Sequence, residues 1–110
     1  MINETITKIE DRLAGSGALT SEQRAELLKL LATLKGEVEG ISATQPETAQ
    51  SIAGFTAVST HEATRESRNQ ELVDLSLRGL QHSVEGFEDS HPRLVQAVNS
   101  ICTTLASLGI

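Results

Sequence analysis

The chain has very few aromatic residues. Its 110 residues include two phenylalanines, Phe55 and Phe87, but neither tryptophan nor tyrosine. Strands favour aromatic and β-branched residues in alternation, with frequent turns between them, and the sequence has no such pattern. Core volume must therefore come from many contacts between Leu, Ile, Val and Ala side chains, which helical bundles accommodate well. We expect a helical protein.

Cysteine and membrane signals are equally scarce. The single cysteine, Cys102, cannot form an internal disulfide, and its place beside Ile101 in an apolar helical pattern predicts a small buried hydrophobe rather than a reactive thiol. Residues 1–13 lack the continuous apolar stretch of a signal peptide or a membrane span, because charges interrupt them at Glu4, Lys8, Glu10, Asp11 and Arg12. We therefore expect a soluble, cytoplasmic protein with no membrane partner.

The charges form no run of one sign. The formal net charge is -6, from 15 acidic and 9 basic residues dispersed along the chain. Nucleic-acid binding would need lysine and arginine gathered on one face, so nucleic acid is not an expected partner. A length of 110 residues fits one domain, residues 1–110, because a second core would lack apolar side chains.

Apolar spacing predicts two helices in the first part of the chain. Apolar residues at steps of three and four indicate a helix over about 2–14, ended by the glycine-rich turn at about 15–17. Thr20 and Gln23 then form the T-x-x-Q pattern of a capping box, so a second, strongly amphipathic helix is expected over about 21–42.

Residues 46–70 give a weaker pattern. Pro46 in a first turn predicts a weak helix over about 46–58, where Ile52, Phe55 and Val58 form a loose apolar stripe. Residues 59–70 offer only Ala63 to bury, so they are expected to form an exposed or mobile segment, as a linker or an exposed helix.

Two regular helices are expected in the last part of the chain, over about 70–88 and 92–108. Leu72 and Leu75 flank the apolar seam of the first of these helices. Across the whole chain, the residues expected to form the core or an interface are Ile6, Ile9, Leu31, Leu34, Leu77, Leu80, Val84, Phe87, Leu94, Val98, Ile101, Leu105 and Leu108.

The last helix has predicted signals at both ends. Ser90 or His91 is expected to cap its start, with Pro92 in the first turn. Gly109 and Ile110 follow the last seam residue and predict a Schellman cap, in which glycine takes the left-handed conformation and isoleucine folds back on the helix.

Glu88 and His91 come closest to a metal-binding motif. Di-iron bundle proteins use Glu-x-x-His, which places both ligands on one helical face. Such sites need two copies of the motif and further carboxylates, whereas this chain has one copy that spans a helix break. We therefore expect capping and turn roles for these residues and no metal.

Other polar groups suggest little chemistry. His61 lies near Glu62 and Glu66, and His82 near Glu85, as expected on a solvated helix surface. The adjacent residues Asp89, Ser90 and His91 contain the side-chain types of a hydrolase triad, but neighbours in a turn cannot easily converge. We expect no cofactor, no catalytic residue and no enzymatic activity.

Two C-terminal stretches resemble a known family. Residues 87–94 (Phe-Glu-Asp-Ser-His-Pro-Arg-Leu) and 105–110 (Leu-Ala-Ser-Leu-Gly-Ile) are similar to the bacterial family called domain of unknown function 4404. Its members end in Phe-Glu-x-Ser-His-Pro-x-Leu and then Leu-Ala-x-x-Gly-Ile. The resemblance covers about the last quarter of the chain well and the first two helices loosely, whereas residues 46–70 look like an addition. It implies a helical, bacterial, cytoplasmic protein and assigns no catalytic residue.

The expected fold is all-α, with antiparallel helical hairpins forming a bundle that self-association completes. Short hairpins with long regular seams bury more apolar surface when they pair. The predicted function is therefore a scaffold or adaptor that forms a homodimer or a larger homo-oligomer. The main alternative is a module in which residues 46–70 bind a different protein. A metal-binding helical bundle is the third hypothesis.

Overall fold

The described part of the chain folds into five helices joined by short loops. The computed structural model describes residues 2–108, with side chains from residue 4 onward. The helices are α1 (Ile2–Ala14), α2 (Ser21–Ser42), α3 (Pro46–Thr64), α4 (Gln70–Ser83) and α5 (Pro92–Ser107). This described part of the chain contains no strand, so the expected all-α class is confirmed. None of the described helices is long and apolar enough to cross a membrane.

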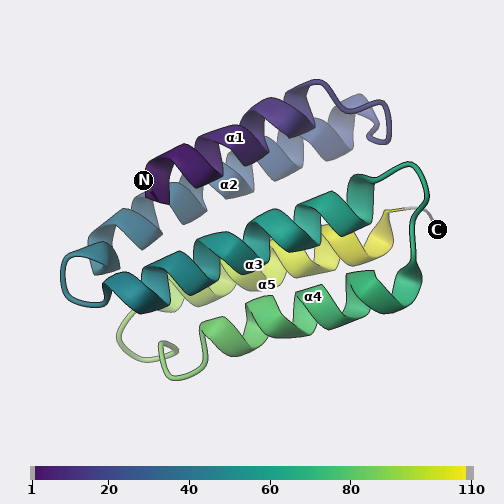
Figure 1. Cartoon of the computed structure of the whole chain (residues 1–110). Helices are drawn as coiled ribbons and strands as arrows, with labels where there is room; N and C mark the ends of the chain where they lie inside the picture. The colour runs from purple at the N-terminus through teal and green to yellow at the C-terminus, as the bar shows by residue number, and fades with distance from the viewer. Residues whose placement is uncertain (1, 109–110) are drawn as a thin grey trace.

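Helix α3 is the central element of the bundle. Consecutive helices run antiparallel, with the α1–α2 hairpin at the top of Figure 1, α4 at the bottom, and α3 and α5 between them. Helix α3 contacts each of the other four helices, whereas the contacts of α1 are with α2 and α3. The packing of the whole bundle therefore depends on how closely these neighbours approach α3.

Helix α3 faces its neighbours with small side chains. Its buried residues are Ala49, Ile52, Ala53, Thr56, Ser59, Thr60 and Ala63. The hydroxyl of Thr56 donates to the Ile52 carbonyl at 2.7 Å, and that of Ser59 donates to the Phe55 carbonyl at 2.7 Å. These hydroxyls are thus paired within their own helix, which removes most of the cost of burying them. Small side chains also let neighbouring helices pack at short interaxial distances.

This packing corrects the expectation for residues 46–70. Helix α3 continues to Thr64 instead of ending near residue 58, and Ser59 and Thr60 are buried although they were expected to be exposed or mobile. The expectation was wrong because it counted only large apolar side chains as material for a core. Residues 65–69 form the connection to α4, where Asn69 Oδ1 accepts hydrogen bonds from two backbone amides of the first turn.

Helix α4 ends at Ser83 instead of near residue 88. The backbone leaves the helical conformation at Val84, whose φ is -109° and ψ is 8°. Gly86 follows with a φ of +93°, in the left-handed region that favours glycine. The amides of Val84 and Phe87 bond to carbonyls three residues earlier, as in a tight turn. Both side chains are nevertheless buried, so the apolar seam continues through the turn.

Two helices begin in different ways. Thr20 Oγ1 accepts from the Gln23 amide at 3.1 Å, and Gln23 Oε1 accepts from the Thr20 amide at 2.9 Å, which completes a capping box at the start of α2. The N-cap residue of α5 is one of the two expected capping residues, but its side chain forms no cap. His91 occupies the N-cap position without a side-chain hydrogen bond, and Pro92 begins the helix with one fewer amide to satisfy.

The C-terminal end of α5 is described only in part. The helix ends at Ser107, one residue before the expected end, and the Leu108 amide bonds to the Leu105 carbonyl. The Schellman cap expected at Gly109 and Ile110 lies outside the described residues.

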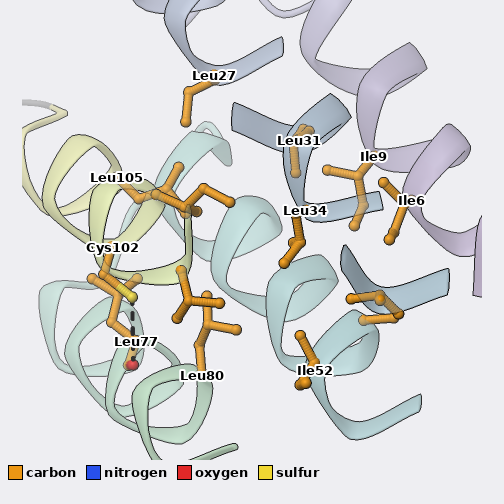
Figure 2. Close-up of a cluster of buried hydrophobic side chains, with 14 of the residues drawn as sticks. Ile6, Ile9, Leu27, Leu31, Leu34, Ile52, Leu77, Leu80, Cys102 and Leu105 are labelled. Carbon is orange, nitrogen blue, oxygen red and sulfur yellow. Dashed lines mark hydrogen bonds between the residues drawn. The ribbon is translucent and has the colours of Figure 1, made fainter. Parts of the chain in front are cut away.

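The predicted seam residues lie in one hydrophobic core. All thirteen are buried: Ile6, Ile9, Leu31, Leu34, Leu77, Leu80, Val84, Phe87, Leu94, Val98, Ile101, Leu105 and Leu108. Figure 2 shows Ile6 and Ile9 beside Leu31 and Leu34, with Ile52 of α3 pointing into the same cluster. The seams therefore pack against one another within a single chain. These thirteen residues are thus buried in the absence of a second copy.

Overpacking α3 should destabilise the protein. Ala53 is 1% exposed, so the added volume of Ala53→Leu has to displace neighbouring helices. We expect the free energy of unfolding to fall by about 1–3 kcal/mol in urea titrations followed by circular dichroism. The matched change Ala25→Leu, at an exposed position of α2, should stay within about 0.5 kcal/mol of wild type. Equal stabilities for the two variants would contradict the close packing of α3.

Candidate functional site

Glu88 and His91 do not converge on a common point. Glu88 Oε2 accepts a hydrogen bond from the Gly86 amide at 2.9 Å, so this carboxylate stabilises its own turn. The His91 ring packs edge-on against Phe87, with 5.5 Å between ring centroids. Among residues whose side chains are described, no group of three or more His, Cys, Asp or Glu residues is placed to hold a metal ion.

The other polar candidates form local pairs. Glu62 Oε1 lies 3.1 Å from Arg65 Nη1, and Glu62 Oε2 lies 3.9 Å from His61 Nε2. His82 Nδ1 lies 2.8 Å from Glu85 Oε1, and both side chains are largely exposed. Each pair joins residues of one short stretch, at most three positions apart. The His82–Glu85 pair lies on the solvated surface, whereas the Glu62 side chain is 13% exposed.

Cys102 lies at the floor of a shallow cavity between α4 and α5. The cavity has a volume of about 300 Å³ and is lined by Asp74, Leu77, Arg78, Gln81, Cys102, Thr103 and Ala106. The thiol points to the Leu77 carbonyl at 3.9 Å, the contact drawn as a dashed line in Figure 2. Burial raises its pKa from 9.0 to about 11, so the thiol stays protonated near neutral pH. A protonated, buried thiol is a poor nucleophile.

The raised pKa predicts slow alkylation of Cys102. A shift from 9.0 to about 11 lowers the thiolate fraction at pH 8 about 100-fold, and burial slows access further. Iodoacetamide labelling followed by mass spectrometry should therefore be at least about 100-fold slower in the native protein than in urea. The thiol of the unfolded chain ionises at a lower pH than the buried thiol, so ionisation favours the unfolded state above pH 9. The contribution of Cys102 to the free energy of unfolding should therefore be lost as the pH rises from 9 to about 11. Equal labelling rates in native and unfolded protein would contradict the burial.

Large apolar side chains gather on the outer side of α3 and α4. Phe55 and Val58 of α3 are 40% and 49% exposed, and Leu72 and Leu75 of α4 are 40% and 59% exposed. We call these four residues the α3–α4 strip. Isolated exposed apolar residues are common on proteins, but a contiguous group on adjacent helices marks an interaction surface more often.

The strip is contiguous because Phe55 lies against Gly79 of α4. A Cβ added at residue 79 would clash with the Phe55 ring, so the missing side chain is what lets the ring lie against the helix. Helices α3 and α4 run antiparallel, which places Val58 one turn beyond Phe55 and Leu75 one turn before Gly79 on the same side. Leu72 extends the apolar surface by a further turn of α4.

The charges at the two ends of the strip are paired within the chain. The Glu62 group, with Arg65 and His61, lies at the end near the α3–α4 connection. His82 and Glu85 lie at the opposite end, on the last turn of α4 and just after it. The Glu62–Arg65 pair is balanced in charge, whereas the His82–Glu85 contact is balanced only when His82 is protonated.

Sequence patterns indicated only part of this surface. The loose stripe of Ile52, Phe55 and Val58 was visible, but Ile52 is fully buried and the other two are exposed. Leu72 and Leu75 stand outside the three-four rhythm of the α4 seam, which was the available signal that they face away from the core. No sequence signal showed that these residues and those of α3 share one surface.

The described residues form a five-helix bundle with an exposed apolar strip on α3 and α4 and without an assembled group of catalytic or ligating side chains. More particularly, residues 27–110 match the family described as "Domain of unknown function (DUF4404)", and the chain belongs to this family. Neither a curated protein nor a solved structure was found to match the chain. The family resemblance seen in the sequence is thus confirmed. The matched range includes residues 46–70 and the whole α3–α4 strip, whereas α1 precedes it.

Proposed function

We propose that the protein is a non-enzymatic scaffold or adaptor whose copies pair through the α3–α4 strip. The observation that carries the proposal is the division of apolar residues between core and surface. The predicted seam residues are buried within one chain, whereas Phe55, Val58, Leu72 and Leu75 remain exposed on two adjacent helices. Burying these four side chains against another apolar surface would remove them from water, which favours association.

A second copy is the occupant that best fits the charge of this surface. Partners selected by charge meet an excess of the opposite sign. Here Glu62 at one end of the strip is paired with Arg65 of the same chain, and Glu71 and Arg78 on α4 have opposite signs, although the chain as a whole carries a formal charge of -6. Two copies could therefore approach through this surface with little repulsion, and each would cover the apolar residues of the other. A cytoplasmic location belongs to the same proposal, because the single cysteine has no partner for an internal disulfide.

The alternative of a different protein partner concerns the same surface. Helix α3 is buried against four neighbours, so residues 46–64 cannot leave the bundle to engage a partner without exposing the core. Only the outer side of α3, with Phe55 and Val58, is available for binding. Self-association and binding of another protein would thus compete for the strip.

Substituting the most exposed strip residue should prevent pairing. We expect light scattering of the wild-type chain at about 100 μM to give twice the monomer mass, and Leu75→Glu to give the monomer mass. Placing a charge at the centre of an apolar interface leaves it desolvated and unpaired. Because Leu75 is 59% exposed, the variant should keep its helical circular dichroism and its melting temperature.

The control is Ala32→Glu, which adds the same charge at an exposed position of α2 and should leave the dimer intact. A wild-type chain that stays monomeric up to about 1 mM would overturn the proposal. Dimers that persist equally in Leu75→Glu and Ala32→Glu would show that a different surface is used. If the wild-type monomer binds another protein and Leu75→Glu does not, the alternative partner is correct.

A further inference from the structure

The outward side of α4 has a regular pattern centred on Leu75. Glu71, Leu75, Arg78 and His82 follow one another at steps of four, three and four, so they lie along one side of the helix. All four residues are exposed. Leu75 belongs both to this row and to the α3–α4 strip. The row therefore places an acidic residue, Glu71, on one side of Leu75 and a basic residue, Arg78, on the other.

The two charges beside Leu75 have no partner in the described part of the chain. Neither the Glu71 carboxylate nor the Arg78 guanidinium forms an ion pair or a side-chain hydrogen bond within residues 2–108. By contrast, Glu62, Arg65, His82 and Glu85 are all engaged in contacts within the chain. Asp74, next to Leu75, accepts a hydrogen bond from Gln70 Nε2 at 2.8 Å. Glu71 and Arg78 are thus the two charged side chains of this row that are available to a partner.

We propose that two copies pair about a two-fold axis near Leu75, with their α4 helices antiparallel, so that Glu71 of each copy faces Arg78 of the other. This inference rests on the proposed self-association and adds the orientation of the partner. In a two-fold dimer each contact occurs twice. Glu71 lies four residues before Leu75 and Arg78 three residues after it, so reversing the helix direction about Leu75 exchanges their positions.

The parallel orientation is disfavoured by the same charges. Parallel α4 helices in register would place Glu71 against Glu71 and Arg78 against Arg78, and like charges in contact are destabilising. The antiparallel orientation instead forms two opposite-charge pairs that flank an apolar centre. Phe55 and Val58 of the adjacent α3 would then cover the side of the contact and exclude water from it.

Charge reversal tests this orientation, with the dimer dissociation constant measured by analytical ultracentrifugation. Glu71→Arg and Arg78→Glu should each weaken the dimer on the order of tenfold, because each creates two like-charge contacts. The double variant with both substitutions should return to within about threefold of wild type. Arg93→Glu, an exposed charge reversal on α5, is the matched control and should have little effect.

Net charge alone predicts a different order of affinities. Glu71→Arg changes the formal charge from -6 to -4 (-6 + 2), and Arg78→Glu changes it to -8 (-6 - 2). If general repulsion governed pairing, Glu71→Arg would tighten the dimer and Arg93→Glu would weaken it as much as Arg78→Glu. That order, or a double variant that fails to recover, would overturn the proposed pairing.

Disulfide trapping gives a second readout of the axis. Leu75→Cys should form a cross-linked dimer under mild oxidation, because the two copies of residue 75 meet at the axis, whereas Ala32→Cys should not. Cys102 is buried and should remain unmodified. A dimer that is lost in Leu75→Glu, but is insensitive to charge reversal and is not trapped by Leu75→Cys, would overturn this orientation and leave the proposed function standing. A wild-type chain that is monomeric at all concentrations would overturn both.

Discussion

The close approach of four helices to α3 is the constraint on which the bundle depends. A helix with so many neighbours cannot carry large side chains on every side, because the interaxial distances would increase and leave voids. The buried side of α3 is accordingly built from alanine, serine and threonine around Ile52. The hydroxyls of Thr56 and Ser59 bond to carbonyls of their own helix, so a polar stretch can serve as the centre of an apolar core.

This arrangement also decides which apolar residues reach the surface. The seam side chains of α1, α2, α4 and α5 are buried and fill the core together with those of α3. Phe55 and Val58 have no place on the crowded sides of α3 and lie on its outer side, next to Leu72 and Leu75 of α4. The exposed strip is therefore a consequence of the central position of α3. Its existence follows from packing, and its use in association is what we propose.

The sequence could predict those features that depend on neighbours along the chain. Steps of three and four residues indicated the core faces, and the pattern of Thr20 and Gln23 indicated the start of α2. The continuation of α3 through Ser59 and Thr60 depends on four other helices, so composition alone suggested exposure. Helix α4 ends at Ser83 and a turn containing Gly86 with a positive φ follows, whereas the apolar spacing continues through this turn to Phe87. Spacing identifies which residues are buried, but it does not distinguish a helix from a turn that buries the same side chains.

The candidate surface was still less predictable, because it joins two helices. Phe55 and Leu75 are 20 residues apart in the sequence, and their proximity depends on the register between α3 and α4. Gly79 is the residue that permits this register, and a glycine inside a helix normally suggests only local weakness. Assigning it a role required the position of the Phe55 ring.

The contact between Phe55 and Gly79 has a consequence for molecular recognition. An exposed aromatic side chain usually samples several rotamers, and a binding partner has to select one of them at an entropic cost. Here Gly79 of α4 lies close to the Cδ1 and Cε1 atoms of the ring and restricts its rotation, so much of that ordering occurs when the monomer folds. The ring then presents the same shape before and after contact. Such a preorganised surface favours fast, rigid association over binding that requires the protein to rearrange.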